Sequence, residues 1–103
     1  MATYYITAID KEKTGNHTYI IRCLVHLVEN TTIRVGKIKT KDEVITLLSN
    51  NIIYTATWAY PHWRGGEKVR SELRNGIRYL RSSPDNQTTD NLLSLLHLSN
   101  LGL

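Results

Sequence analysis

Apolar and polar residues alternate with a period close to two through much of the first half of the chain, a pattern typical of β-strands. Residues 4–9 and 17–28 show it most clearly, and every odd position from 19 to 27 is apolar. The polar stretch over residues 10–16 ends in a Gly-Asn turn signal. A third strand is expected over residues 32–38. Together these three strands are predicted to form an antiparallel meander.

The period changes near residue 40, where Thr40-Lys41-Asp42-Glu43 forms a capping box. In this motif the Thr hydroxyl accepts a hydrogen bond from the backbone N–H three residues later, and the Glu side chain reaches back to the Thr backbone. An apolar stripe follows and ends at Ser-Asn-Asn over residues 49–51. The pattern predicts one short helix that begins after Thr40.

The second half of the chain returns to strand patterns. Residues 52–60 read as a strand, residues 61–66 as a loop, and residues 68–82 as a hairpin. An Asn-Gly pair at 75–76 marks the hairpin turn. A short helix is expected over residues 90–96, where leucines cluster.

These elements predict an α+β fold. We expect an antiparallel sheet of about five or six strands, one helix packed on it, and a short C-terminal helical tail. The length of 103 residues fits a single domain spanning residues 1–103. With 41% apolar and 21% charged residues, the composition excludes a disordered chain.

The location is expected to be cytoplasmic. No stretch approaches the ~20 consecutive apolar residues of a membrane span, and the first residues lack a signal-peptide pattern. A lone cysteine, Cys23, cannot form an internal disulfide, which fits a reducing compartment. We therefore expect no membrane partner.

The net charge of +4 is concentrated in residues 61–83, which hold six basic and two acidic residues. Five of these six cations are arginines. The planar guanidinium matches phosphate and carboxylate geometry better than an ammonium group does. The segment therefore predicts an anion site, most simply for the phosphates of a nucleic acid or nucleotide, with a solvated basic face as the alternative.

The hairpin register sharpens this prediction. A two-residue turn places Arg70 directly opposite Arg81, an unfavourable pair of like charges. Glu72, a tail carboxylate (Asp85 or Asp90) or an external anion is needed to offset the repulsion. The same face also carries Arg74, Ile77 and Tyr79, whereas the opposite face, with Val69, Leu73 and Leu80, is expected to face the core.

The loop before the hairpin places Trp63 beside Arg64, a combination that can stack on nucleic-acid bases. The alternative is that Trp58 is a core residue and Trp63 covers the sheet edge. The predicted binding residues are Trp63, Arg64, Arg70, Arg74, Tyr79 and Arg81.

Catalytic and metal-binding patterns are not found in the sequence. Cys23 lies on the apolar face of its strand and His26 on the other, which argues against a Cys–His nucleophile. The four histidines lack metal-ligand spacing, and no phosphate-binding glycine loop is present. We therefore expect no enzyme activity, no catalytic residues, no metal and no cofactor.

Several segments resemble a small bacterial and phage family known only as a domain of unknown function. The start (residues 4–9), the helix start (40–45) and residues 66–69 contribute, but most of the resemblance lies in Tyr-Leu-Arg-Ser-Ser-Pro-Asp at 79–85 and Asp-Asn-Leu at 90–92. Here Ser82 replaces the family's usual Thr, and Leu-Leu-His at 95–97 replaces a Leu-Pro ending. The resemblance implies a compact sheet-rich domain without an established activity.

Two functions follow as expectations. The first is a non-enzymatic binding protein whose Arg-rich face binds nucleic acid or a nucleotide-bearing complex. The second is a phage or mobile-element inhibitor or adaptor that contacts an acidic protein partner through the same face. The resemblance to a family found on mobile elements suggests anti-defence activity, including anti-CRISPR activity, for this alternative.

Overall fold

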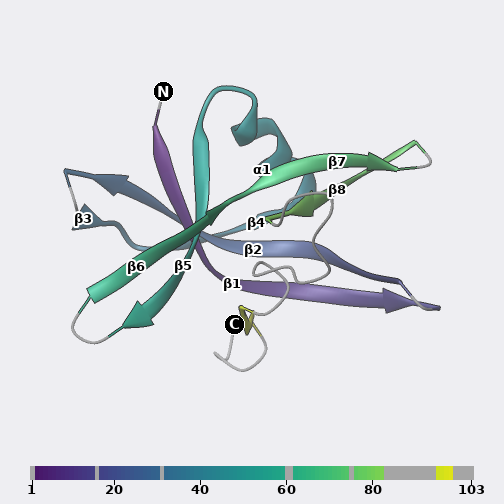
Figure 1. Cartoon of the computed structure of the whole chain (residues 1–103), viewed down its shortest axis with the longest axis horizontal. Helices are drawn as coiled ribbons and strands as arrows, with labels where there is room; N and C mark the ends of the chain where they lie inside the picture. The colour runs from purple at the N-terminus through teal and green to yellow at the C-terminus, as the bar shows by residue number, and fades with distance from the viewer. Residues whose placement is uncertain are drawn as a thin grey trace.

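The computed structural model describes residues 2–15, 17–30, 32–59, 62–74, 76–82 and 95–98. Within them the chain is mostly strand, with one helix (Figure 1). The elements in chain order are β1 (Thr3–Thr14), β2 (His17–Glu29), β3 (Thr32–Ile33), β4 (Lys37–Thr40), α1 (Lys41–Leu48), β5 (Ile52–Ala59), β6 (His62–Lys68), β7 (Arg70–Arg74), β8 (Ile77–Arg81) and β9 (Leu96–His97).

The main sheet is mixed, so the expectation of a purely antiparallel sheet is wrong. Its order is β3-β2-β1-β5-β6, with β4 also beside β2 and β9 beside β1. β1 is antiparallel to β2 but parallel to β5 over Thr3–Ile6 and parallel to β9 at Ala8–Ile9. The chain returns through α1 before it enters β5, and such a crossover brings a strand back parallel. Alternation within a strand carries no information about its direction relative to distant strands.

The first hairpin is longer than its sequence pattern suggests. The strand was expected to end at residue 9, but β1 continues through the polar residues to Thr14 and pairs with β2 as far as His17. The turn contains Gly15, whose φ is +61°. Backbone pairing satisfies the N–H and C=O groups here while the charged side chains of residues 11–13 stay exposed.

The strand expected over residues 32–38 is interrupted, and its two parts, β3 and β4, both pair antiparallel with β2. The His26 ring occupies the interruption, with its Nδ1 2.9 Å from the carbonyl oxygen of Arg34. Gly36 passes so close that a Cβ there would lie 2.7 Å from Cε1 of the ring. The Arg34 backbone N–H still donates to the Leu27 carbonyl of β2 at 2.8 Å, but the regular ladder is interrupted where the chain passes the His26 ring.

Two further expectations change in the second half of the chain. The loop expected over residues 61–66 is mostly β6, because its backbone pairs antiparallel with β5. Most of the helix expected over residues 90–96 lies outside the described residues. Its last residue, Leu96, is in β9, which pairs with the edge of β1 at Ala8 and Ile9. A backbone partner at that edge thus replaces helical hydrogen bonds at the end of the predicted tail helix.

The core lies between the main sheet, α1 and the base of the β7–β8 hairpin. Its buried members come from distant parts of the chain: Ile6, Ile9, Ile20, Cys23, Val25, Val44, Ile53, Val69 and Leu80. Ile45, Leu47 and Leu48 of α1 pack against this cluster. Burial of each large apolar side chain contributes about 1.5–3 kcal/mol.

The helix begins as predicted, with a complete capping box. The Glu43 backbone N–H donates to Thr40 Oγ1 (3.3 Å), and the Thr40 backbone N–H donates to Glu43 Oε1 (2.9 Å). Hydrogen bonding to the carboxylate by the Thr40 backbone N–H, and after it by the Thr40 side chain, holds the pKa of the Glu43 carboxyl below its ordinary value of 4.5. Asp42 and Glu43 also lie at the positive end of the helix dipole.

Replacing Thr40 with alanine is expected to lower the free energy of unfolding by about 0.5–2 kcal/mol, because a backbone N–H loses its acceptor. Because the folded pKa of Glu43 is lowered, its contribution is present above the ordinary pKa of 4.5 and is lost as the pH falls through the folded pKa. Urea unfolding at neutral and acidic pH measures both effects. Thr40→Ser keeps the hydroxyl and serves as the control; equal stability of the Ala variant and the parent would contradict the cap.

Candidate functional site

The arginine-rich segment forms a two-stranded ribbon, β7–β8, that is a separate sheet from the main one. Its register places Arg70 opposite Arg81 and Glu72 opposite Tyr79, as the sequence predicts. Gly76 in the turn has φ +80°, a conformation that glycine adopts without strain. Figure 1 shows β6 continuing into β7 along one line, with the ribbon extending to the right on the same side as the far end of the β1–β2 hairpin.

The facing arginines have different environments. Nη1 of Arg81 donates to Oε2 of Glu72 at 3.1 Å, with side chains 18% and 29% exposed. Glu72 therefore offsets the charge of Arg81 from within the ribbon. Arg70 is exposed. The tail carboxylates that were the alternative partners, Asp85 and Asp90, lie outside the described residues.

Tyr79 connects the ribbon to the rest of the fold. Its ring lies edge-to-face with Tyr19 of β2, with centroids 6.3 Å apart. Nζ of Lys41, in the first turn of α1, lies 5.5 Å from the Tyr79 centroid, a cation–π distance. Because both contacts occupy the ring, the geometry gives Tyr79 the role of positioning the ribbon.

The opposite face of the ribbon is buried only at its base. Val69 and Leu80 are 1% and 5% exposed, as expected for core residues. Leu73 was also expected in the core, but it is 60% exposed because the ribbon extends beyond the area that the sheet covers. Ile77 is 49% exposed and Arg78 is exposed, so the distal half of the ribbon presents both apolar and cationic groups to solvent.

The structure brings four of the six predicted binding residues onto the ribbon and leaves two outside it. Arg70, Arg74, Tyr79 and Arg81 share one face by register. Trp63 and Arg64 lie on β6, where their backbones pair with residues 58 and 57 of β5. For Arg74, Trp63 and Arg64 the structure describes the backbone only.

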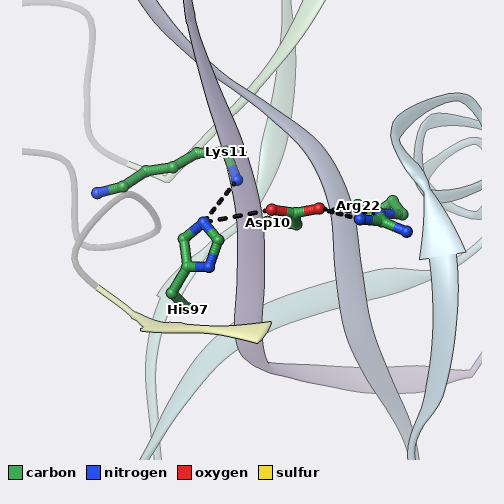
Figure 2. A network of polar contacts seen from close by, with 4 residues as sticks. All are labelled: Asp10, Lys11, Arg22 and His97. Carbon is green, nitrogen blue, oxygen red and sulfur yellow. Dashed lines mark hydrogen bonds and ion pairs between the residues drawn. The ribbon is translucent and has the colours of Figure 1, made fainter. Parts of the chain in front are cut away.

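A polar network on β1 was not predicted from the sequence (Figure 2). Oδ2 of Asp10 accepts from Nε of Arg22 at 3.0 Å, and Oδ1 of Asp10 lies 3.2 Å from Nε2 of His97. The backbone N–H of Lys11 also points to that Nε2, at 3.5 Å. The network joins β9 to β1 and β2. The register pair Asp10–Arg22 was accessible to sequence reasoning, but the pairing of β9 with β1 was not.

The family described as a protein of unknown function, DUF3892, matches residues 5–96, which run from β1 into β9 and include the whole ribbon. The chain belongs to the DUF3892 family. The expected resemblance to a family of unknown function is thus confirmed. No curated protein and no solved structure matches the chain.

Cys23 of this DUF3892 chain is buried, with 0% of its surface exposed. Burial raises the pKa of its thiol to about 12. Since the thiolate is the reactive form, a thiol that stays protonated in the core is a poor nucleophile. This agrees with the expected role of Cys23 in packing.

A thiol reagent is expected to label Cys23 only when the protein unfolds, because native Cys23 is both covered and protonated. The unfolded thiol ionises near its ordinary pKa of 9.0, whereas the buried thiol stays protonated up to about 12. The contribution of Cys23 to stability is therefore fully present below pH 9.0 and is lost as the pH rises towards about 12. Labelling rates across a urea titration test the prediction. Rapid labelling without denaturant would contradict it.

Over the described ranges, His, Cys, Asp and Glu side chains form no group of three or more that could hold a metal ion. No helix in that part of the chain is long and apolar enough to cross a membrane.

Proposed function

We propose that the chain is a non-enzymatic nucleic-acid-binding protein and that the β7–β8 ribbon is its contact surface. The observation that supports this most is the exposure of Arg70 and Arg78 on a two-stranded ribbon outside the main sheet. A two-stranded antiparallel ribbon fits the major groove of duplex DNA. Arginine supplies the phosphate contacts that position such an element.

The placement of charge on the ribbon adds support. Register puts Arg70 on the face of Tyr79 and Arg78 on the face of Leu80, so both faces carry an exposed cation. The major groove of DNA is bordered by two phosphate backbones. A ribbon inserted into the groove with a cation on each face can contact one backbone with each cation. The surplus of positive charge in residues 61–83 favours polyanion binding without restricting the sequence bound.

A second candidate function has its own observation. Leu73 and Ile77, both at the far end of the ribbon, are 60% and 49% exposed. Exposed apolar groups flanked by cations are also suited to an acidic protein partner with an apolar contact. In that case the chain is an inhibitor or adaptor that acts through protein–protein contact.

Binding of the parent protein to labelled oligonucleotides separates these functions. Fluorescence anisotropy with single- and double-stranded DNA and RNA, at several salt concentrations, is the measurement. Phosphate contacts predict that the logarithm of the affinity falls linearly with the logarithm of the salt concentration. No binding at low salt to any of these probes would rule out the nucleic-acid function and leave the protein partner.

A further inference from the structure

Two hollows flank the junction between β6 and β7. The larger, about 750 Å³, lies between the turn after α1 and the start of β7, and its apolar lining is Leu48, Ile52 and Val69. The smaller, about 530 Å³, is lined in part by Glu67 and Ser82. Lys68 and Arg70 line both. Two exposed cations therefore border each hollow, and among the described lining residues a carboxylate is found only in the smaller.

The larger hollow lies at the C-terminal end of α1, where uncovered carbonyl groups repel anions. Here two of these carbonyls are covered by the chain itself. The Thr46 carbonyl accepts from the Ser49 hydroxyl at 2.7 Å, and the Leu47 carbonyl accepts from Nδ2 of Asn51 at 2.9 Å. The electrostatic obstacle to an anion at this end of the helix is correspondingly reduced.

The larger hollow is also lined by neutral hydrogen-bond donors. Asn50 lines it with an exposed side chain that carries an amide NH₂. Ser71 also lines it, and its Oγ accepts from Nη1 of Arg78 at 3.4 Å, so its hydroxyl hydrogen can turn to another acceptor. The ammonium of Lys68 and the guanidinium of Arg70 supply charge-assisted donors.

We propose that this larger hollow, the Lys68 groove (lined by Leu48, Asn50, Ile52, Lys68, Arg70 and Ser71), is a binding site for a phosphoryl group. Its volume lies in the range of small-molecule sites, roughly 300–1,000 Å³, and exceeds what a phosphate alone fills. The apolar side of the groove accommodates the sugar or base that carries the phosphate. The ligand is thus a mononucleotide or the phosphorylated end of a strand, and the site lies at the base of the ribbon, with which it shares Arg70.

The first experiment compares ligands on the parent protein. AMP, inorganic phosphate and adenosine are titrated and followed by amide chemical shifts of the groove residues. AMP is expected to bind with at least about tenfold higher affinity than adenosine, because only AMP pairs with the cations. Equal affinities for AMP and adenosine, or no shift with AMP, would overturn the proposal.

The second experiment compares variants. Lys68→Gln removes a groove cation and Asn50→Asp adds a groove carboxylate; each is expected to weaken AMP binding about tenfold or more. Lys37→Gln, at an exposed lysine of β4, is the matched control and leaves AMP affinity unchanged. If Lys68 only complements the end of α1, Lys68→Gln lowers the melting temperature while AMP affinity stays at the parent value, which overturns the proposal.

A third experiment distinguishes a free nucleotide from a strand end as the ligand, and the groove from the distal ribbon as the binding site. A 5′-phosphorylated oligonucleotide that binds more tightly than its 5′-hydroxyl form identifies a strand end as a ligand, whereas AMP binding alone identifies a free nucleotide. Arg74→Gln, next to the turn of the ribbon and outside the groove lining, is expected to weaken oligonucleotide binding and to leave AMP binding unchanged. Loss of AMP binding in Arg74→Gln would overturn the assignment of the phosphate to this groove.

Discussion

Replacing Gly66 with alanine is expected to lower the free energy of unfolding by about 2–4 kcal/mol. A Cβ at this position would lie 2.5 Å from Oγ1 of Thr55 and 3.4 Å from its carbonyl oxygen. A Cβ atom does not approach a non-bonded oxygen to 2.5 Å in folded proteins. Either β6 therefore moves away from β5 or the Thr55 side chain rotates. Denaturant unfolding of both proteins measures the cost.

Both movements, the shift of β6 and the rotation of Thr55, lower the free energy of unfolding. Thr55 is 3% exposed, and its Oγ1 accepts the backbone N–H of Glu67 at 3.0 Å. The register between β5 and β6 shifts at this point, so the Thr hydroxyl replaces a ladder hydrogen bond that the irregularity removes. Rotation of Thr55 would leave a backbone N–H without its acceptor, and separation of the strands would break the ladder itself.

Two variants control this experiment. Gly76→Ala adds a methyl group where no atom lies within 4 Å, so its expected cost, about 1–2 kcal/mol, comes only from the backbone φ of +80°. Combining Thr55→Ala with Gly66→Ala removes the clash, and the double variant should be more stable than the sum of the single effects predicts. A Gly66→Ala cost no larger than that of Gly76→Ala would contradict the close approach.

Replacing Arg70 and Arg78 with glutamine is expected to weaken oligonucleotide binding by about tenfold for each arginine at low salt. Each loss should also reduce the slope of log affinity against log salt by about 1, because one fewer phosphate is neutralised. Both side chains are exposed, so the melting temperature should change little. Anisotropy titrations at several salt concentrations measure affinity and slope together.

The matched control is Arg34→Gln, which replaces an exposed arginine that pairs with Glu29 at 3.2 Å and is located between β3 and β4, outside the ribbon. It removes the same charge and should leave the affinity near the parent value. Arg81→Gln is the structural comparison, because it leaves Glu72 half-buried without the cation that pairs with it, and we expect a loss of about 1 kcal/mol of stability. Equal weakening by Arg34→Gln and Arg70→Gln would show that only net charge matters and would contradict a defined ribbon site.

The features predicted correctly depend on neighbouring residues. The capping box needs only Thr40 and Glu43, and the ribbon register follows from the Asn-Gly turn at 75–76. The features predicted wrongly depend on distant partners. The parallel pairing of β1 with β5 and β9, and the strand character of residues 62–66, are set by pairing with strands far along the chain.

The same division applies to the candidate site. Charge and register identified the Arg70–Arg81 pair and named Glu72 as one possible partner, and the structure shows Glu72 paired with Arg81. Tyr19 and Lys41, which hold the ring of Tyr79, come from other elements and no local pattern connects them to it. Exposure of Leu73 likewise depends on where the main sheet ends, which alternation along β7 does not reveal.

The central position of β1 constrains the order in which the chain acquires its structure. Among the described strands β1 is synthesised before the others, yet its neighbours on one side are β5 at Ile52–Ala59 and β9 at Leu96–His97. The β1–β2 hairpin forms from nearby residues, but the opposite edge of β1 stays open until those later segments emerge. Pairings this distant in sequence slow folding and leave strand edges available to other chains. A nascent chain that stalls before residue 97 therefore presents an uncompleted sheet edge, and chaperone demand during synthesis should be highest in that interval.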